Sequence, residues 1–201
     1  YISGVLNNPD CFAFNELLPG GFTPKFGGIV TDLSLVMGTK GETADELNYD
    51  VSVSFGENEI EYMISNTINP SMGPNTPFSF NPGTYTQTEA SINADVSKYI
   101  SDSFFAAAGA EYRYEAFDAV AGDPASYEVG PLASQGFGIG SNGFPGLSAA
   151  YQGKASRNSM ALWVDTEYYA SDDLTIGAAV RYEDFTDFGS TVKGKVSGRY
   201  Q

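Results

Sequence analysis

Residues 47–56 decide the fold, and they read Leu47-Asn48-Tyr49-Asp50-Val51-Ser52-Val53-Ser54-Phe55-Gly56. Apolar side chains occupy the odd positions, and small or polar residues occupy the even positions. Successive side chains of a β-strand point to opposite faces, so this alternation predicts a strand with one apolar and one polar face. The spacing of three and four that predicts an amphipathic helix is not sustained along the chain.

The same alternation recurs and predicts about seven strands, at residues 29–41, 47–64, 84–98, 104–118, 157–169, 174–184 and 191–201. Several are longer than the five or six residues usual in soluble sheets, and strands of about nine to eleven residues suit a tilted membrane strand. Short polar turns alternate with long loops at 65–83 and 119–156 that are rich in Gly, Pro, Asn and Ser. We therefore expect an all-β protein, an antiparallel up-and-down meander that is part of a transmembrane β-barrel, with an external loop at 1–28.

Composition limits the classes of function. The 201 residues include 25 acidic and 10 basic side chains, for a formal net charge of −15, which argues against nucleic acid as a partner. Histidine is absent and Cys11 is the single cysteine, so a Ser-His-Asp triad, a multi-thiolate zinc site and an internal disulfide are excluded. We expect no enzyme activity, no catalytic residue, no cofactor and no metal.

Charged residues gather on the predicted polar face. Glu111, Arg113 and Glu115 lie two apart on one strand, and we expect them to pair with Arg181 and Glu183 across neighbouring strands. In a barrel these residues form a charge ladder that faces the lumen, whereas in a soluble sheet they form only the solvent side. A hydrolase site with paired carboxylates is a sharper alternative, which needs a pocket to hold the two acids at a defined separation.

The two long loops are where ligand contacts are expected, because loops carry a large share of binding residues. Aromatic and amide side chains supply stacking surface and hydrogen bonds there, and the candidates are Asn66, Asn69, Phe78, Phe80, Tyr127, Phe137, Phe144 and Tyr151. An alternative reading is that these side chains only pack the loops against each other.

Two further motifs have a functional and a plain interpretation. Glu57, Glu59 and Glu61 are either a cation site that bridges lipopolysaccharide at the external rim or a solvated acidic rim. Residues 138–143 (GIGSNG) match the dinucleotide-binding fingerprint, but no βαβ unit surrounds them, and we interpret them as a surface loop.

Four stretches resemble TonB-dependent outer-membrane receptors. They are residues 56–62 (GENEIEY) with 64–74 (ISNTINPSMGP), 109–115 (GAEYRYE), 122–127 (GDPASY) and 179–191 (AVRYEDFTDFGST). The resemblance extends in order from about residue 22 to the end of the chain. It implies a bacterial outer-membrane transporter with a barrel of about 22 strands and an N-terminal plug in the lumen. Such a receptor takes up a scarce nutrient, for example an iron–siderophore chelate.

The resemblance also implies partners: outer-membrane lipid and lipopolysaccharide, the plug, the TonB complex and a small-molecule ligand. This sequence departs from the family in showing no plug, no TonB-contacting segment and only about a third of the strands. We therefore expect a fragment of the barrel wall with some external loops. Cys11 falls in the predicted external loop, where it has a disulfide partner before Tyr1 or is a free thiol. A passive porin-like channel and a soluble β-sandwich for binding or adhesion are the alternative functions.

Overall fold

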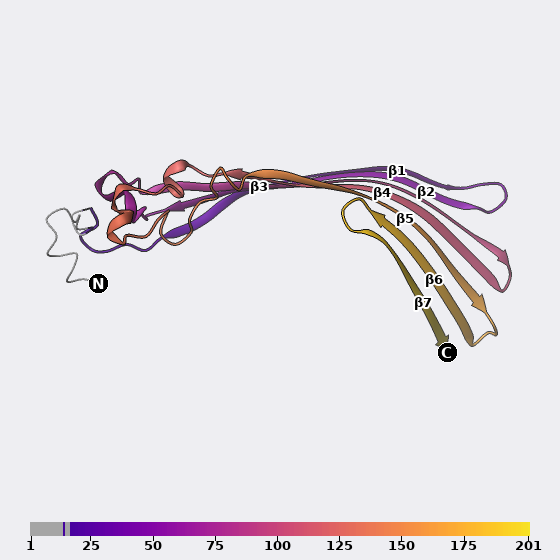
Figure 1. Ribbon diagram of the computed structural model, residues 1–201. Coiled ribbons are helices and arrows are strands. Elements are labelled where there is room, and N and C mark those ends of the chain that lie inside the picture. The colour runs from indigo at the N-terminus through magenta and orange to yellow at the C-terminus, as the bar shows by residue number, and fades with distance from the viewer. Residues whose placement is uncertain (1–13, 15–16) are drawn as a thin grey trace. The chain divides into compact units, whose positions relative to one another are not determined.

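The computed structural model describes residue 14 and residues 17–201. Seven strands form one sheet and follow one another in chain order, as Figure 1 shows. The strands are β1 (Lys25–Glu42), β2 (Asn48–Ser65), β3 (Ser79–Ser101), β4 (Phe104–Ala121), β5 (Gly153–Tyr169), β6 (Leu174–Phe185) and β7 (Gly189–Tyr200). Each strand pairs with the next strand along the chain, which confirms the predicted all-β antiparallel meander.

Several strands are longer than the alternation predicted. β3 begins at Ser79 rather than at residue 84, and β5 begins at Gly153 rather than at residue 157. The predicted external loop at 1–28 ends earlier, because β1 already begins at Lys25. These ends contain Gly, Pro and polar residues without alternation, and backbone hydrogen bonds to the neighbouring strand hold them in the sheet.

From β1 to β6 the connections alternate between short turns and long loops, as expected. Between β1 and β2 the turn is closed by the Thr43 amide, which donates to the Leu47 carbonyl at 2.9 Å, and Glu46 adopts a left-handed φ of 59°. Short turns also join β3 to β4, β5 to β6 and β6 to β7. Long loops follow β2 and β4, and they contain the 3₁₀ helices η2 (Pro70–Asn75), η3 (Pro124–Ser126) and η4 (Pro131–Gln135).

The chain divides into two compact units. The loop unit contains the described residues up to Thr31 together with Asn58–Thr86 and Asp118–Lys154. The sheet unit contains Asp32–Glu57, Gln87–Phe117 and Ala155–Gln201. The long loops belong to the first, and all of β6 and β7 belong to the second.

A small apolar core lies in the loop unit, where Ile64, Ile68 and Phe80 are almost completely buried. Aromatic side chains from strands and loop extend it. The ring of Phe144 lies 4.5 Å from that of Phe26 and 5.5 Å from that of Tyr62. Phe144 thus packs the second long loop against β1 and β2.

In the sheet unit, by contrast, the strands form one layer. The described residues contain one seven-stranded sheet, whereas a soluble β-sandwich requires two facing sheets to bury its apolar side chains. The part of the chain that the structure describes therefore does not form the two facing sheets that the sandwich alternative predicts.

Candidate functional site

The polar face of the sheet unit carries a continuous charge network. Arg181 on β6 donates to Glu111 on β4 at 3.0 Å and to Glu183 on its own strand at 3.0 Å. Glu183 also binds Lys193 on β7, with 3.2 Å between the carboxylate oxygen and Nζ. Arg113 pairs with Glu111 and lies 3.9 Å from Glu89 on β3. Six charged side chains on four strands are thereby joined, and we call this set the charge network.

The link between Arg181 and Glu111 depends on a small residue between them. β5 separates β4 from β6, so the two side chains are not on neighbouring strands as the sequence suggested. Ala161 of β5 is paired with Glu183 and is 5% exposed. Its methyl group does not obstruct the Arg181 guanidinium, which reaches across β5 to Glu111.

Glu115 has a different partner from the one expected. Its carboxylate accepts from the Nε of Arg157 at 2.7 Å, and Arg157 also lies 3.9 Å from Asp187. The Arg157 guanidinium faces the rings of Phe185 and Phe188, 5.7 and 5.9 Å from their centroids. Sequence reasoning missed Arg157, although it has the same parity as Asp165 and Glu167 on the polar face of β5.

These ion pairs bear on the paired-carboxylate alternative. Glu111 lies between two guanidinium groups, and Glu115 is bound by a third. Each of these carboxylates is thus engaged in an ion pair with an arginine. The geometry therefore favours a structural ladder over an acid–base pair.

The opposite face of the sheet unit is apolar. On β5–β7 the register aligns Leu162 with Tyr182 and Val192, and Val164 with Val180. Along the other strands, alternation places the apolar side chains on this same face. The apolar face comprises Leu33, Leu35, Met37, Val51, Val53, Ile92, Val96, Tyr112, Met160, Leu162, Val164, Tyr168, Ile176, Val180, Tyr182, Val192, Val196 and Tyr200.

Exposure on the two faces is the reverse of that in a soluble protein. Residues of the apolar face are 42% (Val51) to 80% (Val196) exposed. The side chains of Glu111 and Glu183 are only 14% and 15% exposed. A large contiguous apolar surface marks a site of contact with protein or membrane.

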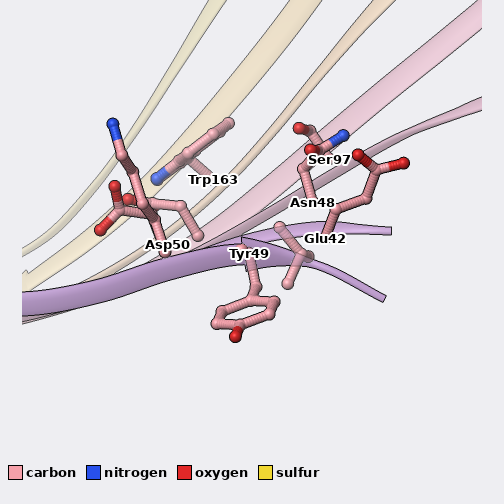
Figure 2. A pocket seen from close by; sticks show the side chains of 10 residues that line it. Glu42, Asn48, Tyr49, Asp50, Ser97 and Trp163 are labelled. Carbon is pink, nitrogen blue, oxygen red and sulfur yellow. The ribbon is translucent and has the colours of Figure 1, made fainter. Parts of the chain in front are cut away.

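An open hollow of about 580 Å³ lies in the sheet unit beside the β1–β2 turn. Figure 2 shows Trp163 and Asp50 on one side of the β2 ribbon and the ring of Tyr49 on the other. Gly109 leaves the space that Trp163 uses, because a side chain there would meet its indole nitrogen and the Asp95 carboxylate. The hollow is lined by Lys40, Gly41, Glu42, Asn48, Tyr49, Asp50, Asp95, Val96, Ser97 and Trp163.

Two of the predicted ligand contacts are structural residues instead. Asn69 is fully buried, and its amide nitrogen donates to the carbonyls of Ala125 and Glu128 at 2.9 and 3.0 Å. Its amide oxygen accepts from the Ser71 hydroxyl at 2.7 Å. Phe80 is 4% exposed. Neither side chain is accessible to a ligand, and Asn69 in addition joins the two long loops.

The other loop candidates are not gathered into one site. Asn66 is exposed and donates to the Thr23 carbonyl at 2.9 Å, and Phe78 is also exposed. Phe137 packs edge-on against Phe14, with 5.4 Å between ring centroids. Phe144 is in the aromatic cluster described above, Tyr127 is half-buried, and Tyr151 is 79% exposed. Asn66, Phe78 and Tyr151 thus offer the most accessible surface among these candidates.

The acidic cluster and the glycine-rich loop also have defined contacts. Glu57, Glu59 and Glu61 accept singly from Thr88, Thr86 and Asn81, at 3.5, 3.3 and 2.8 Å. Among the described residues, no three acidic side chains are grouped closely enough to hold a metal ion. In the loop 138–143 the buried Ser141 donates from its amide to the Ser126 carbonyl at 2.9 Å, so this loop is anchored.

Two further predictions concern Cys11 and membrane-spanning helices. Cys11 lies outside the described residues, and its pairing stays a prediction. In residue 14 and residues 17–201, no helix is long and apolar enough to cross a membrane.

Comparison with known proteins gives one structural match to report. No family model matches the sequence. No curated protein matches it either. A chain from the structure of the RagAB peptide transporter is similar over 87% of this chain, with 13% identity and a TM-score of 0.46. The matched region is 20% of that chain, so this protein spans about a fifth of its length.

Proposed function

We propose that this chain is a stretch of the wall of a bacterial outer-membrane β-barrel that transports a nutrient. The observation that carries the proposal is the inverted exposure of the sheet unit, with apolar side chains outside and ion-paired charges on the other face. Outer-membrane barrel strands have this alternation, with apolar residues facing lipid and polar residues facing the lumen.

The free energy of transferring the apolar face from water into lipid supports a membrane environment. Moving a Val or Leu side chain from water into apolar surroundings is worth about 1.5–3 kcal/mol. The apolar face presents many such side chains, and no second layer of the described chain covers it. Lipid acyl chains would remove them from water, and the charge network would remain on the hydrated side.

The finer proposal is a TonB-dependent receptor for a scarce nutrient such as an iron–siderophore chelate. The four sequence stretches given above support it. The charge network would then face the plug, through which the TonB complex acts, and the loop unit would face the external ligand. We propose lipid and lipopolysaccharide as partners of the apolar face, and we propose no enzyme activity and no nucleic-acid partner.

A passive porin-like channel remains the second candidate, because a charged lumen wall suits both classes. The reading frame upstream of Tyr1 separates them. A plug-sized domain after the signal peptide supports the receptor, whereas a signal peptide directly before the barrel supports the channel.

The test of the wall itself uses the full chain in buffer, in detergent and in lipid vesicles. Sedimentation and far-UV circular dichroism should find aggregation in buffer and a β-sheet spectrum only in detergent or lipid. A soluble monomer that unfolds cooperatively in buffer would overturn the membrane proposal, because the apolar face would then be stable in water.

A further inference from the structure

Within the sheet unit, the apolar face ends abruptly along β2. Val51 and Val53 are exposed apolar residues, and Phe55 follows them with the same parity. The next residue of that parity is Glu57, whose carboxylate accepts from the Thr88 hydroxyl of β3 at 3.5 Å. The side of β2 that is apolar up to Phe55 is therefore polar from Glu57 onward.

The neighbouring strands change at corresponding places. On β3, Ile92 and Ala90 are followed toward the loop end by Thr88. On β5, the exposed Met160 is followed by Asn158, whose amide oxygen accepts from the Tyr112 hydroxyl at 2.8 Å. The change from apolar to polar side chains therefore occurs on β2, β3 and β5 and is not confined to Glu57.

The loop unit, taken by itself, has the reverse arrangement on β2. Glu59 and Glu61 bind Thr86 and Asn81, whereas Ile60, Tyr62 and Ile64, which have the other parity, are apolar and half-buried or buried. Ile64 is 1% exposed, and Tyr62 stacks on Phe26 with 5.6 Å between ring centroids. Here the long loops cover the apolar side of the strand, and the acidic side is the hydrated one.

The length of the apolar run on β4 matches a membrane. From Phe104 to Tyr114, every second residue is Ala, Phe or Tyr, with aromatic side chains at both ends. This run covers about ten steps of roughly 3.3 Å, and a tilt of about 40° reduces its height to about 25 Å. An apolar band of about 25 Å between aromatic girdles is the height expected of an outer-membrane barrel.

We propose that lipid contact ends at Phe55 on β2, Tyr114 on β4 and Met160 on β5, and that the polar stretches of β2 and β5 beyond these residues are hydrated. The partner of the apolar face up to this boundary is the acyl chains of the bilayer. The inference rests on the proposed barrel wall and adds the position of its external boundary. The physical reason is that a carboxylate such as Glu57 is strongly disfavoured among acyl chains, whereas Phe and Tyr are favoured at the interface.

The test is a set of single-cysteine variants of the full chain in a Cys11→Ser background, labelled with an environment-sensitive fluorophore in phosphatidylcholine vesicles. The probe sites are Val51→Cys, Val53→Cys, Glu57→Cys and Glu59→Cys, with Ser52→Cys as the matched polar-face control. Quenching by lipids that carry a doxyl group on the acyl chain should be several-fold stronger at the two valine sites than at the two glutamate sites. Ser52→Cys should also be weakly quenched.

Other quenching patterns would overturn the boundary, and some of them would also overturn the wall. Quenching at Glu57→Cys and Glu59→Cys as strong as at Val51→Cys would overturn the boundary and leave the membrane wall intact. Weak quenching at all sites, or equal quenching at Val51→Cys and Ser52→Cys, would overturn the wall and the boundary together. Thr88→Cys on β3 should repeat the result at Glu57→Cys without removing the carboxylate.

Discussion

A charge introduced in the middle of the apolar face gives the sharpest test of the proposal that this face contacts lipid. Val180 lies between Val164 on β5 and Gly194 on β7, so this row offers no carboxylate to an added cation. We expect Val180→Arg to destabilise the folded chain in lipid vesicles by about 2–4 kcal/mol, the cost of Arg near the midplane on the lipid face of a barrel.

The matched control is the next residue along β6. Ala179 faces the opposite side, between Asp165 and Lys195. An arginine there has a carboxylate beside it and water around it, so Ala179→Arg should cost less than about 1 kcal/mol.

The assay is urea-induced unfolding in vesicles, followed by far-UV circular dichroism or tryptophan fluorescence. The expected result is a lowered free energy of unfolding for Val180→Arg and a nearly unchanged one for Ala179→Arg. Equal losses, or a larger loss for Ala179→Arg, would refute the assignment of the apolar face to lipid.

Three further substitutions test the packing described above. Arg181→Met removes two ion pairs of 3.0 Å from a partly exposed network and should lower the free energy of unfolding by about 1–2 kcal/mol; an unchanged value would mean that the network contributes nothing to stability. Gly109→Ala should displace Trp163, the single tryptophan of the chain, shift its fluorescence emission and lower the free energy of unfolding by about 1–3 kcal/mol. Gly194→Ala is the control and should be nearly neutral, because the atom nearest to the added methyl group is 3.8 Å away. Asn69→Ala should cost about 2–4 kcal/mol, because it leaves several buried polar groups of the long loops without partners; limited proteolysis should then cleave residues 122–152 faster, which the exposed Asn75→Ala should not cause.

The charge network is itself nearly neutral, which suits a polar face that lines a lumen. Its members alternate in sign from Glu89 through Arg113, Glu111 and Arg181 to Glu183 and Lys193, so the charges largely cancel within the wall. Under the proposed function, a plug or ligand would meet a surface whose charges are already paired. The barrel would then keep its shape while its lumen contents move.

The sequence by itself determined the seven strands and the alternation of turn and loop lengths. Side-chain alternation is a local property of an extended backbone, so Tyr49, Val51 and Val53 report the strand and its apolar face without any knowledge of the neighbours. The same local signal placed Glu111, Arg113 and Glu115 on one polar face. It did not reveal strand ends such as Ser79–Thr84, which depend on pairing with another strand.

Only the tertiary structure decided which residues meet. Arg181 reaches Glu111 across β5 because Ala161 is small, and Glu115 binds Arg157 on β5 instead of a residue of β6. Both results depend on the register between strands, which the alternation within one strand does not reveal. Asn69 appeared to be a loop residue available to a ligand, but the folding of one long loop over the other buries it. The change of polarity at Glu57 has meaning only when Thr88 and Asn158 are seen to continue it on other strands, since a single acidic residue in one strand does not define a boundary.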